Sequence, residues 1–267
     1  MHKDPAACVT HKKSWGAYHL LALESPEIAS QAVPGQFIMV RTSPLYQPLL
    51  RRPLSIHSVS GPELHLFFQA VGHGTQLLAR ADTGQALDIL GPLGRGFDLS
   101  GDLEGRKTAL VGGGRGIAPL FFLAHALRKK GAEARVFYGG LSEKDLVLRE
   151  RFSSAGFAAA CSTEDGSTGF HGLITELVQR ETAGSYAPDR MYACGPDGML
   201  QAVAKLARRL NIPAELSLES IMGCGFGACW GCVHKIRQDG EDAWRKVCEE
   251  GPVFPAEAVV WEEEDRQ

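Results

Sequence analysis

The sequence lacks the features of several protein classes. It has no excess of positive charge, since 28 lysines and arginines stand against 31 aspartates and glutamates, a formal net charge of −3. Nucleic acid backbones require concentrated positive charge, so we expect no nucleic acid partner. No run of 18 apolar residues is present, and the amino-terminal MHKDPAACVTHKK has no apolar signal-peptide core. We therefore expect no membrane partner and a cytoplasmic location.

Glycine and cysteine are the residues in excess. Thirty-one glycines make up about 12% of the chain, against ~7% in average proteins, and there are seven cysteines. Cytoplasmic thiols stay reduced, so clustered cysteines point to metal ligation or redox chemistry rather than to disulfides. The length of 267 residues suits two domains and a smaller appendage.

The pattern of predicted secondary structure changes near residue 100. Before that point, short β-type runs are separated by turn residues: AYHLLALE, GQFIMVRT, PLSIHSVS, LHLFFQAV and ALDILG. Closely spaced strands without long helical periodicity predict an antiparallel β-barrel or sandwich. The glycine-rich, charged stretch 91–107 predicts the boundary of this domain.

Strands and helices alternate in residues 101–220. The patterns predict strands over 108–114, 134–140, 157–163, 189–195 and 214–220, and helices over 119–131, 146–156, 174–182 and 198–211. Such alternation predicts a doubly wound α/β domain with a parallel sheet. The remaining segment, 221–267, has four of the seven cysteines and too few apolar residues for a core of its own. We expect a metal centre to hold it together.

That segment contains a spaced cysteine cluster. Cys224, Cys229 and Cys232 form C-x4-C-x2-C, and Cys248 follows after fifteen more residues, which is the ligand spacing of a plant-type 2Fe-2S cluster. Intervening glycines allow the backbone to wrap closely around the sulfurs. A structural zinc site is the alternative, but such sites usually combine two C-x2-C pairs, and one is present here. The overall prediction is a multidomain α+β protein with a barrel (1–100), an α/β nucleotide domain (101–220) and a 2Fe-2S segment (221–267).

A glycine-rich loop lies between the first predicted strand and helix of the α/β domain. Four glycines occur within five residues: Gly112, Gly113, Gly114 and Gly116. Backbone N–H groups and a helix start at such a turn can hold a pyrophosphate. No acidic residue ends the second strand, so the pattern does not decide between NAD and NADP. The motif Cys194-Gly195-Pro196 ends a later strand, where ligands of open α/β sheets bind.

Two motifs in the first domain could bind a second diphosphate. Arg52-Pro53-Leu54-Ser55 lies between two strands, and Gly72-His73-Gly74-Thr75 opens a helical segment. Arginine offers a bidentate fork for phosphate, and a helix start offers N–H groups. Each motif alone is more often a surface arginine or an ordinary helix cap, but together with the glycine loop they form a consistent set.

With these motifs, the chain resembles the ferredoxin–NADP reductase superfamily, and most closely the electron-transfer subunits of NAD-linked (class 1B) dihydroorotate dehydrogenase. The resemblance covers nearly the whole chain, and its most specific parts are MGCGFGACWGC (222–232) and VCEEGPVF (247–254). It implies an oxidoreductase subunit with FAD, a 2Fe-2S cluster and NAD(H), in a hetero-oligomer with an FMN-containing catalytic subunit of pyrimidine biosynthesis.

The resemblance also implies roles for individual residues. Ser55 near the flavin and Cys194 near the nicotinamide would be the catalytic residues. Those that would contact FAD are Arg52, Pro53, Leu54, Ser55, Phe68, Gln69, Gly74 and Thr75. Those that would contact the nicotinamide nucleotide are Gly112, Gly113, Gly114, Gly116, Cys194, Gly195 and Pro196. The cluster ligands would be Cys224, Cys229, Cys232 and Cys248.

Flavin can exchange both one and two electrons, so FAD would stand between the nicotinamide and the cluster.

Two alternative functions remain. One is the small subunit of a sulfide dehydrogenase or of an electron-bifurcating ferredoxin:NADP reductase, whose relatives tend to have an aspartate where this chain has Cys224. The other is a redox-sensing or relay protein without nucleotide turnover. Departures from the family pattern lie at Phe68-Gln69, Arg115 and Ile221. Phe226 and Trp230 are the candidates for partner docking.

Overall fold

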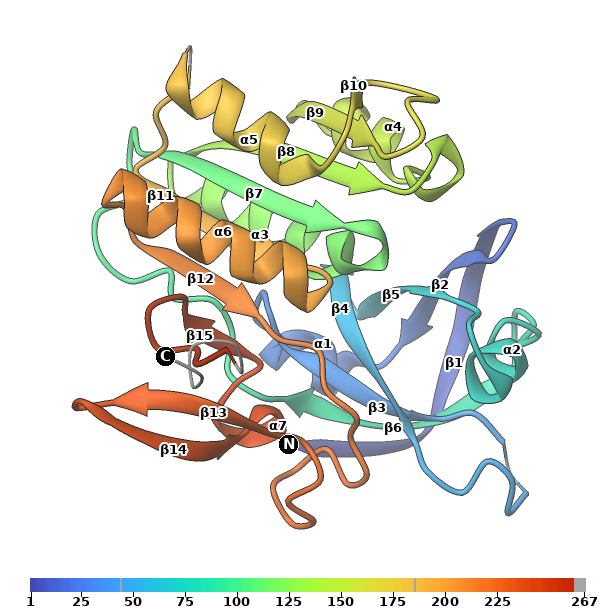
Figure 1. Ribbon diagram of the computed structural model, residues 1–267. Helices are drawn as coiled ribbons and strands as arrows, with labels where there is room; N and C mark the ends of the chain where they lie inside the picture. Colours follow the sequence, from blue (N-terminus) through green and yellow to red (C-terminus); the bar gives the residue numbers. More distant parts are fainter. Residues whose placement is uncertain (44, 185, 262–267) are drawn as a thin grey trace.

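The amino-terminal part of the chain is a closed six-stranded barrel, which confirms the predicted antiparallel barrel (Figure 1). The computed structural model describes residues 1–43, 45–184 and 186–261. Neighbouring strands follow the order β1-β2-β5-β4-β3-β6, and all pairs are antiparallel. The strands are β1 (His2–Trp15), β2 (Tyr18–Glu24), β3 (Phe37–Arg41), β4 (Arg52–Ser60), β5 (Glu63–Gln69) and β6 (Ala86–Leu93). Two short helices accompany them, α1 (Pro26–Gln31) and α2 (His73–Leu78).

The second part is a seven-stranded sheet in the order β10-β9-β8-β7-β11-β12-β15. Every pair is parallel except β12 with β15. The strands are β7 (Lys107–Gly113), β8 (Glu133–Gly140), β9 (Ala158–Thr163), β10 (Phe170–His171), β11 (Arg190–Cys194), β12 (Ala214–Ser217) and β15 (Val253–Pro255). The helices are η1 (Gly114–Ile117), α3 (Ala118–Lys129), η2 (Glu143–Asp145), α4 (Arg149–Ser154), α5 (Ile174–Ala183) and α6 (Asp197–Leu210). The predicted parallel sheet is confirmed.

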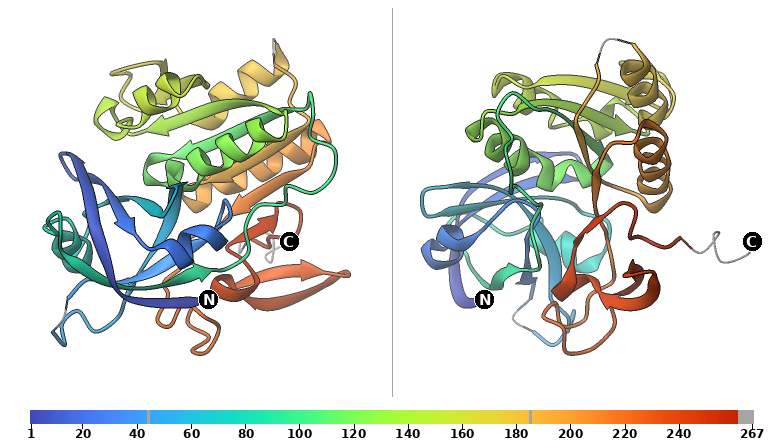
Figure 2. Two further views of the ribbon diagram at one scale, coloured as in Figure 1. Left: turned by 180° about the vertical axis from the view of Figure 1, so that it is seen from behind. Right: turned by 90° about the vertical axis from the view of Figure 1, so that its left-hand side faces the viewer.

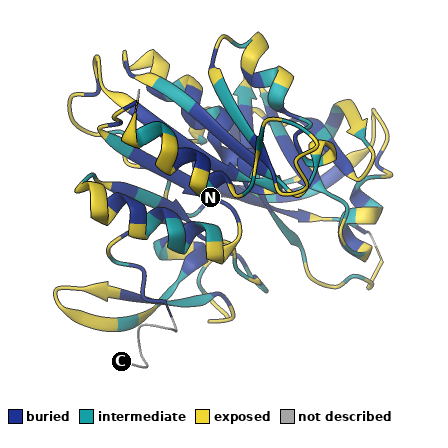
Figure 3. Ribbon diagram, turned by 45° about the horizontal axis from the view of Figure 1, so that its top comes forward, coloured by how far each residue is buried: buried dark blue, intermediate teal, exposed yellow. Residues whose placement is uncertain are grey.

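Helices cover both faces of this sheet because each presents an apolar stripe to it. Helices α3 and α4 pack on one face through residues such as Leu123 and Phe152. Helices α5 and α6 pack on the other through Val178 and Val203. The right-hand view of Figure 2 shows the two layers, and Figure 3 shows buried strands between exposed loops. No helix in the described part of the chain is long and apolar enough to cross a membrane.

The strand β12 is shorter than predicted. The pattern AELSLES predicted a strand through residue 220, but β12 ends at Ser217. Only four residues pair with β11, and the chain then turns away from the sheet. Glu219 and Ser220 therefore leave the carboxyl end of a parallel strand, which is where ligands of such sheets bind.

The carboxy-terminal segment packs against both larger parts. It contains the hairpin β13 (Val233–Gln238) and β14 (Glu241–Lys246), the short helix α7 (Val247–Glu250) and β15, which joins the seven-stranded sheet. Val247, Phe254 and Trp261 share one buried cluster with Leu200 of α6 and Met39 of the barrel. The segment is thus held by apolar contacts with its neighbours and does not depend on its cysteines alone. The last six residues of the expected 221–267 segment lie outside the described residues.

Candidate functional site

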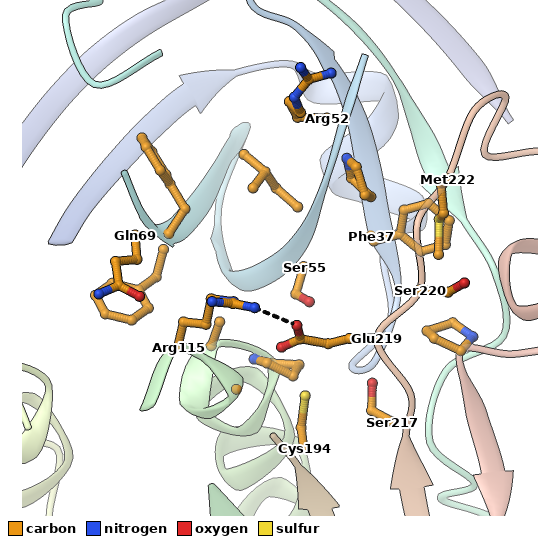
Figure 4. A pocket seen from close by; sticks show the side chains of 18 of the residues that line it. Phe37, Arg52, Ser55, Gln69, Arg115, Cys194, Ser217, Glu219, Ser220 and Met222 are labelled. Atoms are coloured by element: carbon orange, nitrogen blue, oxygen red, sulfur yellow. Dashed lines mark hydrogen bonds and ion pairs between the residues drawn. The ribbon is translucent and has the colours of Figure 1, made fainter. Parts of the chain in front are cut away.

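A cavity of about 230 Å³ lies between the barrel and the sheet (Figure 4). Its walls come from β4, β5, the start of α3, the end of β11 and the chain after β12. The structure brings together here nine of the residues that the sequence singled out: Arg52, Pro53, Leu54, Ser55, Phe68, Gln69, Thr75, Gly116 and Cys194. We call this space the barrel cavity.

One end of the barrel cavity is basic. The guanidinium of Arg52 lies so close to Gly74 that a Cβ at Gly74 would overlap it. Arg52 donates one hydrogen bond to the carbonyl of Leu50 (2.7 Å). The Thr75 hydroxyl accepts N–H groups of Val71 and Gly72, so it caps the start of α2. Arg52 thus lies against the first turn of α2, an arrangement that is compatible with diphosphate binding.

Neighbouring arginines of the barrel have different roles. Arg51 is tied to Asp88 by a 2.7 Å ion pair and by a 2.8 Å hydrogen bond to its carbonyl, so it fastens β6 to the start of β4.

Phe68 lines the cavity, but its ring is 2% exposed and stacks on His19 within the barrel core. A ligand would therefore meet Phe68 mainly through its backbone.

A second cavity, of about 650 Å³, lies along the carboxyl ends of the parallel strands. We call it the nucleotide cavity. The predicted residues Gly113, Gly114 and Pro196 line it, with Gly139, Gly140 and Met199 beside them. Gly112 and Gly195 do not line it. A Cβ at Gly195 would overlap Met199, which does line it, whereas one at Gly112 would overlap Ile117, which does not.

The glycine loop and the Cys194 motif touch each other directly. A Cβ at Gly116 would overlap the carbonyl oxygen of Cys194, so only glycine permits this approach. Cys194 itself is 3% exposed. Burial, reinforced by the charge of Glu219, raises the pKa of its thiol to about 12. The side chain is therefore a neutral thiol at neutral pH and can act as a donor or packing group, but not as a thiolate nucleophile.

Three residues line both cavities: Gln69, Arg115 and Glu219. The guanidinium of Arg115 and the carboxylate of Glu219 form a 2.9 Å ion pair across this border (Figure 4). The sequence pattern does not single out Glu219, because it predicts a strand that runs through this residue. Its position directly after a parallel strand was the signal that could have found it.

The far wall of the nucleotide cavity is acidic. Asp145 and Glu164 line it, and Asp145 accepts a 2.8 Å hydrogen bond from the Tyr18 hydroxyl. Burial and this hydrogen bond raise the pKa of Tyr18, so the phenol stays protonated. Among the described residues that line this cavity, Arg115 is the only cationic side chain.

The four cysteines of the carboxy-terminal segment lie in two interacting pairs. Cys224 and Cys229 interact electrostatically, as do Cys232 and Cys248, and the N–H of Cys248 points at the sulfur of Cys232 (3.4 Å). The charge of Cys224 also acts on Cys248, so the pairs are neighbours. Burial opposes ionisation of Cys224, but hydrogen bonds from three backbone N–H groups outweigh it and lower the pKa of this thiol to about 6.

A ligand set made of sulfur alone is compatible with a 2Fe-2S cluster and with a zinc ion. Among the described residues, no three or more histidine, cysteine or acidic side chains converge as ligands of one metal ion. A tetrahedral zinc site would need all four thiolates around one point, whereas a 2Fe-2S cluster needs two thiolates on each of two irons. The N–H of Gly227 also points at the sulfur of Cys248 (3.2 Å), as backbone wrapping of a cluster requires.

The cysteine loop is exposed on its outer side. Phe226 and Trp230 are 47% and 58% exposed, and Cys229 is itself exposed. Trp230 adopts the left-handed conformation (φ 56°), which glycine would adopt at lower cost. The Lys246 ammonium lies 4.8 Å from its ring. Two large aromatic side chains thus lie on the exposed outer face of this loop.

Comparisons with known proteins identify related domains and chains. Residues 219–260 match the iron-sulfur cluster binding domain of dihydroorotate dehydrogenase B, and residues 110–205 match the oxidoreductase NAD-binding domain. The chain is 40% identical to the dihydroorotate dehydrogenase B (NAD(+)) electron transfer subunit of Desulforamulus reducens, over 91% of this chain and 93% of that one. It is also 40% identical to that of Bacillus caldolyticus, over 90% and 91%. A solved NADH-dependent reduced ferredoxin-NADP oxidoreductase superposes with a TM-score of 0.84 at 27% identity, over 97% of this chain and 91% of that one.

Proposed function

Because the chain belongs to the family of dihydroorotate dehydrogenase B electron transfer subunits, we propose that it transfers electrons between NAD and a catalytic subunit that acts on dihydroorotate. The observation that carries this function is the 40% identity that extends over 91% of the chain, including both the NAD-binding and the cluster-binding parts. The chain is then the oxidoreductase subunit of a hetero-oligomer in pyrimidine biosynthesis. We place that complex in the cytoplasm.

Each of the three groups would have its own site. The flavin part of FAD would occupy the barrel cavity, the four cysteines would hold a 2Fe-2S cluster, and NAD(H) would occupy the nucleotide cavity. Flavin supplies the link between the two-electron chemistry of nicotinamide and the one-electron chemistry of the cluster. The protein's contribution is to fix these groups relative to one another and to keep water away from them.

In the barrel cavity, Arg52 and the N–H groups beside Gly74 would hold the FAD diphosphate. Pro53, Leu54 and Ser55 would line the flavin ring, with Ser55 placed to hydrogen-bond its reactive edge. Ser55 and Cys194 line the same cavity from the barrel and from the sheet. They would position flavin and nicotinamide against each other, and the neutral thiol of Cys194 would do so without adding a charge.

In the nucleotide cavity, the turn from β7 into η1 would hold the pyrophosphate. The acidic wall formed by Asp145 and Glu164 favours NAD over NADP, because carboxylates accept hydrogen bonds from ribose hydroxyls and repel a 2′-phosphate. Isothermal titration should therefore give tighter binding of NAD⁺ than of NADP⁺. Equal affinities would contradict this preference.

The outer face of the cysteine loop would meet the catalytic subunit, which we take to contain FMN. Cys224, Cys229, Cys232 and Cys248 would ligate the cluster, and Phe226 and Trp230 would supply the apolar contact around it. Exposed aromatic side chains are common anchors of protein interfaces. The near-neutral net charge gives no strong electrostatic steering, so shape and apolar area would decide docking.

A second candidate function has support from one observation, the TM-score of 0.84 to an NADH-dependent reduced ferredoxin-NADP oxidoreductase of a study on flavin-based electron bifurcation. In that case the partner would be a different flavoprotein. The higher sequence identity to the dihydroorotate dehydrogenase subunits, 40% against 27%, favours the first function.

Reconstitution tests the proposal. The chain should be co-expressed with a dihydroorotate dehydrogenase catalytic subunit, and the complex should reduce NAD⁺ with dihydroorotate, which neither subunit should do alone. The isolated chain should contain flavin and about two iron atoms, and NADH should bleach its flavin. A stable complex that is inactive with dihydroorotate would favour the second candidate, and failure of both NADH and NADPH to bleach the flavin would favour a relay protein without nucleotide turnover.

A further inference from the structure

The Arg115–Glu219 ion pair lies at the junction of the two cavities. Both side chains line the barrel cavity and the nucleotide cavity, and apart from Gln69 no other described residue does so. Arg115 comes from η1 and Glu219 from the chain after β12, and their ion pair joins the two segments at this border (Figure 4). A dinucleotide that spans both cavities would therefore contact these side chains.

The ion pair can be broken at little cost in free energy. The Arg115 and Glu219 side chains are 49% and 45% exposed, and ion pairs with that much solvent access contribute little to stability. Each side chain makes this one polar contact among the described residues. A ligand phosphate can offer Arg115 two parallel charge-assisted hydrogen bonds in its place.

Arg115 is also the group that the cavity needs for a dianionic ligand. It stands between Gly114, whose φ is 51°, and Gly116, inside the turn where a pyrophosphate would lie. The other charged residues that line the nucleotide cavity are Asp145, Glu164 and Glu219, all acidic. Without Arg115, only backbone N–H groups would balance the two phosphate charges.

We propose that Arg115 exchanges partners when a pyrophosphate-containing dinucleotide binds. In the nucleotide-free chain its guanidinium pairs with Glu219 and closes the passage between the cavities. The incoming pyrophosphate takes the guanidinium, the passage opens, and Glu219 is left without its cation. Glu219 is thus a competitor for the arginine and lowers the affinity for nucleotide, while Arg115 raises it. This inference rests on the proposed nucleotide-binding function.

The exchange predicts opposite effects on NAD⁺ affinity for two variants that each replace a charged side chain by a neutral one. Titration calorimetry with NAD⁺ on the full, oxidised, flavin-loaded chain should give binding at least about tenfold weaker for Arg115→Gln, the loss of a hydrogen bond to a charged group. Glu219→Gln should bind several-fold tighter, because the competitor is gone. The tightening should be much smaller when Glu219→Gln is added to Arg115→Gln, since the competition acts through the arginine. Arg115→Lys is the matched control that keeps the charge, and it should fall between wild type and Arg115→Gln.

Other outcomes separate the two proposals. If Arg115→Gln binds NAD⁺ as tightly as wild type, then the arginine only fills the passage and the exchange is wrong. If Glu219→Gln weakens binding, Glu219 is a nucleotide ligand rather than a competitor, and the exchange is again wrong. In both cases the nucleotide-binding function stands. If the wild-type chain binds no NAD⁺ while its flavin and iron absorbance are intact, the proposed function itself fails. Retained absorbance in each variant shows that it has folded.

Discussion

Two glycine-rich loops of this protein have similar composition but different physical purposes. In the nucleotide loop (112–116), Gly116 is required because a Cβ would strike the backbone carbonyl of Cys194. In the cluster loop (223–231), Gly225 is required because its φ of 83° curves the chain around the cysteines and its Cα lies against Met39 of the barrel. The first loop is held by contact with a neighbouring strand. The second loop also lies against a strand, β3, but it depends in addition on its own left-handed curvature, so composition alone does not reveal what a glycine does.

The largest effect should come from removing one cluster ligand while leaving the nucleotide loop intact. Cys229→Ser should lose about two iron atoms per chain, because a hydroxyl is a poor substitute for a thiolate, and should abolish electron transfer to the partner. Cys229 is exposed, so the fold should survive. Reduction of the flavin by NADH should stay within about twofold of wild type, as expected for separate sites. Stopped-flow absorbance measures both, and equal loss of both reactions would show that the two loops are not independent.

The converse variant acts on the nucleotide loop. In Gly116→Ala, the added methyl meets the backbone of β11, which cannot move aside as a side chain can. The loop must shift, and a displacement of about 1 Å at a reaction site can cost about 100-fold in rate. Flavin reduction by NADH should fall by that order while the iron content is unchanged. Gly184→Ala, at the end of α5 with only ordinary contacts for its methyl, is the matched control and should behave as wild type.

A smaller effect is expected for Gly225→Ala in the cluster loop. The methyl overlaps the fully buried Met39 side chain and the backbone stays in a left-handed conformation. Overpacking and strain of this kind cost about 1–3 kcal/mol. Denaturant unfolding should report that loss, whereas NAD⁺ affinity should not change. A change in NAD⁺ affinity without a loss of stability would place the two loops in one cooperative unit.

The smallest effect, a change in Tm, is expected at Glu215, which connects the sheet to the chain that follows the barrel. The N–H of Asp98 donates to Glu215 on β12 (3.1 Å). Burial raises the pKa of Glu215 from 4.5 to about 7. Between those pH values the folded chain holds a proton that the unfolded chain releases, so this residue destabilises the fold increasingly as the pH rises from about 4.5 to about 7. Glu215→Gln should therefore raise Tm above pH 7 by about 1–4 °C.

Well below pH 4.5 the Glu215→Gln variant and the wild type should have the same Tm, because both side chains are then neutral in the folded and unfolded chains. The glutamine keeps an acceptor oxygen for the Asp98 N–H. A Tm difference that does not vary with pH would assign the effect to packing and contradict the titration of Glu215.

Most of the architecture could be predicted because hydrophobic periodicity records burial. Five barrel strands lie within two residues of the predicted runs, but β1 was not assigned. Its sequence HKDPAACVTHKKSW has long polar stretches, and Ala7 and Val9 are its buried residues. A strand that is mostly solvent-exposed leaves little periodic signal. The hairpin β13–β14 was missed for the same reason, since Ile236 is its one buried residue.

The border of the two cavities could not be predicted from sequence. Arg115 and Glu219 are 104 residues apart, and their pairing depends on β12 ending at Ser217. The apolar pattern in LSLES continues past Ser217, so the sequence predicts a longer strand than β12. The cysteines could be identified because their spacing is local, whereas a contact between two distant loops has no local signature.

The antiparallel strand β15 has a consequence for how such a protein can be truncated or rebuilt. It pairs Phe254 with Leu216 and Val253 with Ser217, so it covers hydrogen-bonding groups of β12 that would otherwise be open to other chains. An uncovered edge strand is a template for intermolecular pairing and aggregation. β15 itself is three residues long and ends in Pro255, which lacks a donor for further pairing. Deleting residues 221–267 to obtain a simple NAD-linked flavin reductase should therefore give an aggregating protein, because the segment that carries the cluster also seals the sheet.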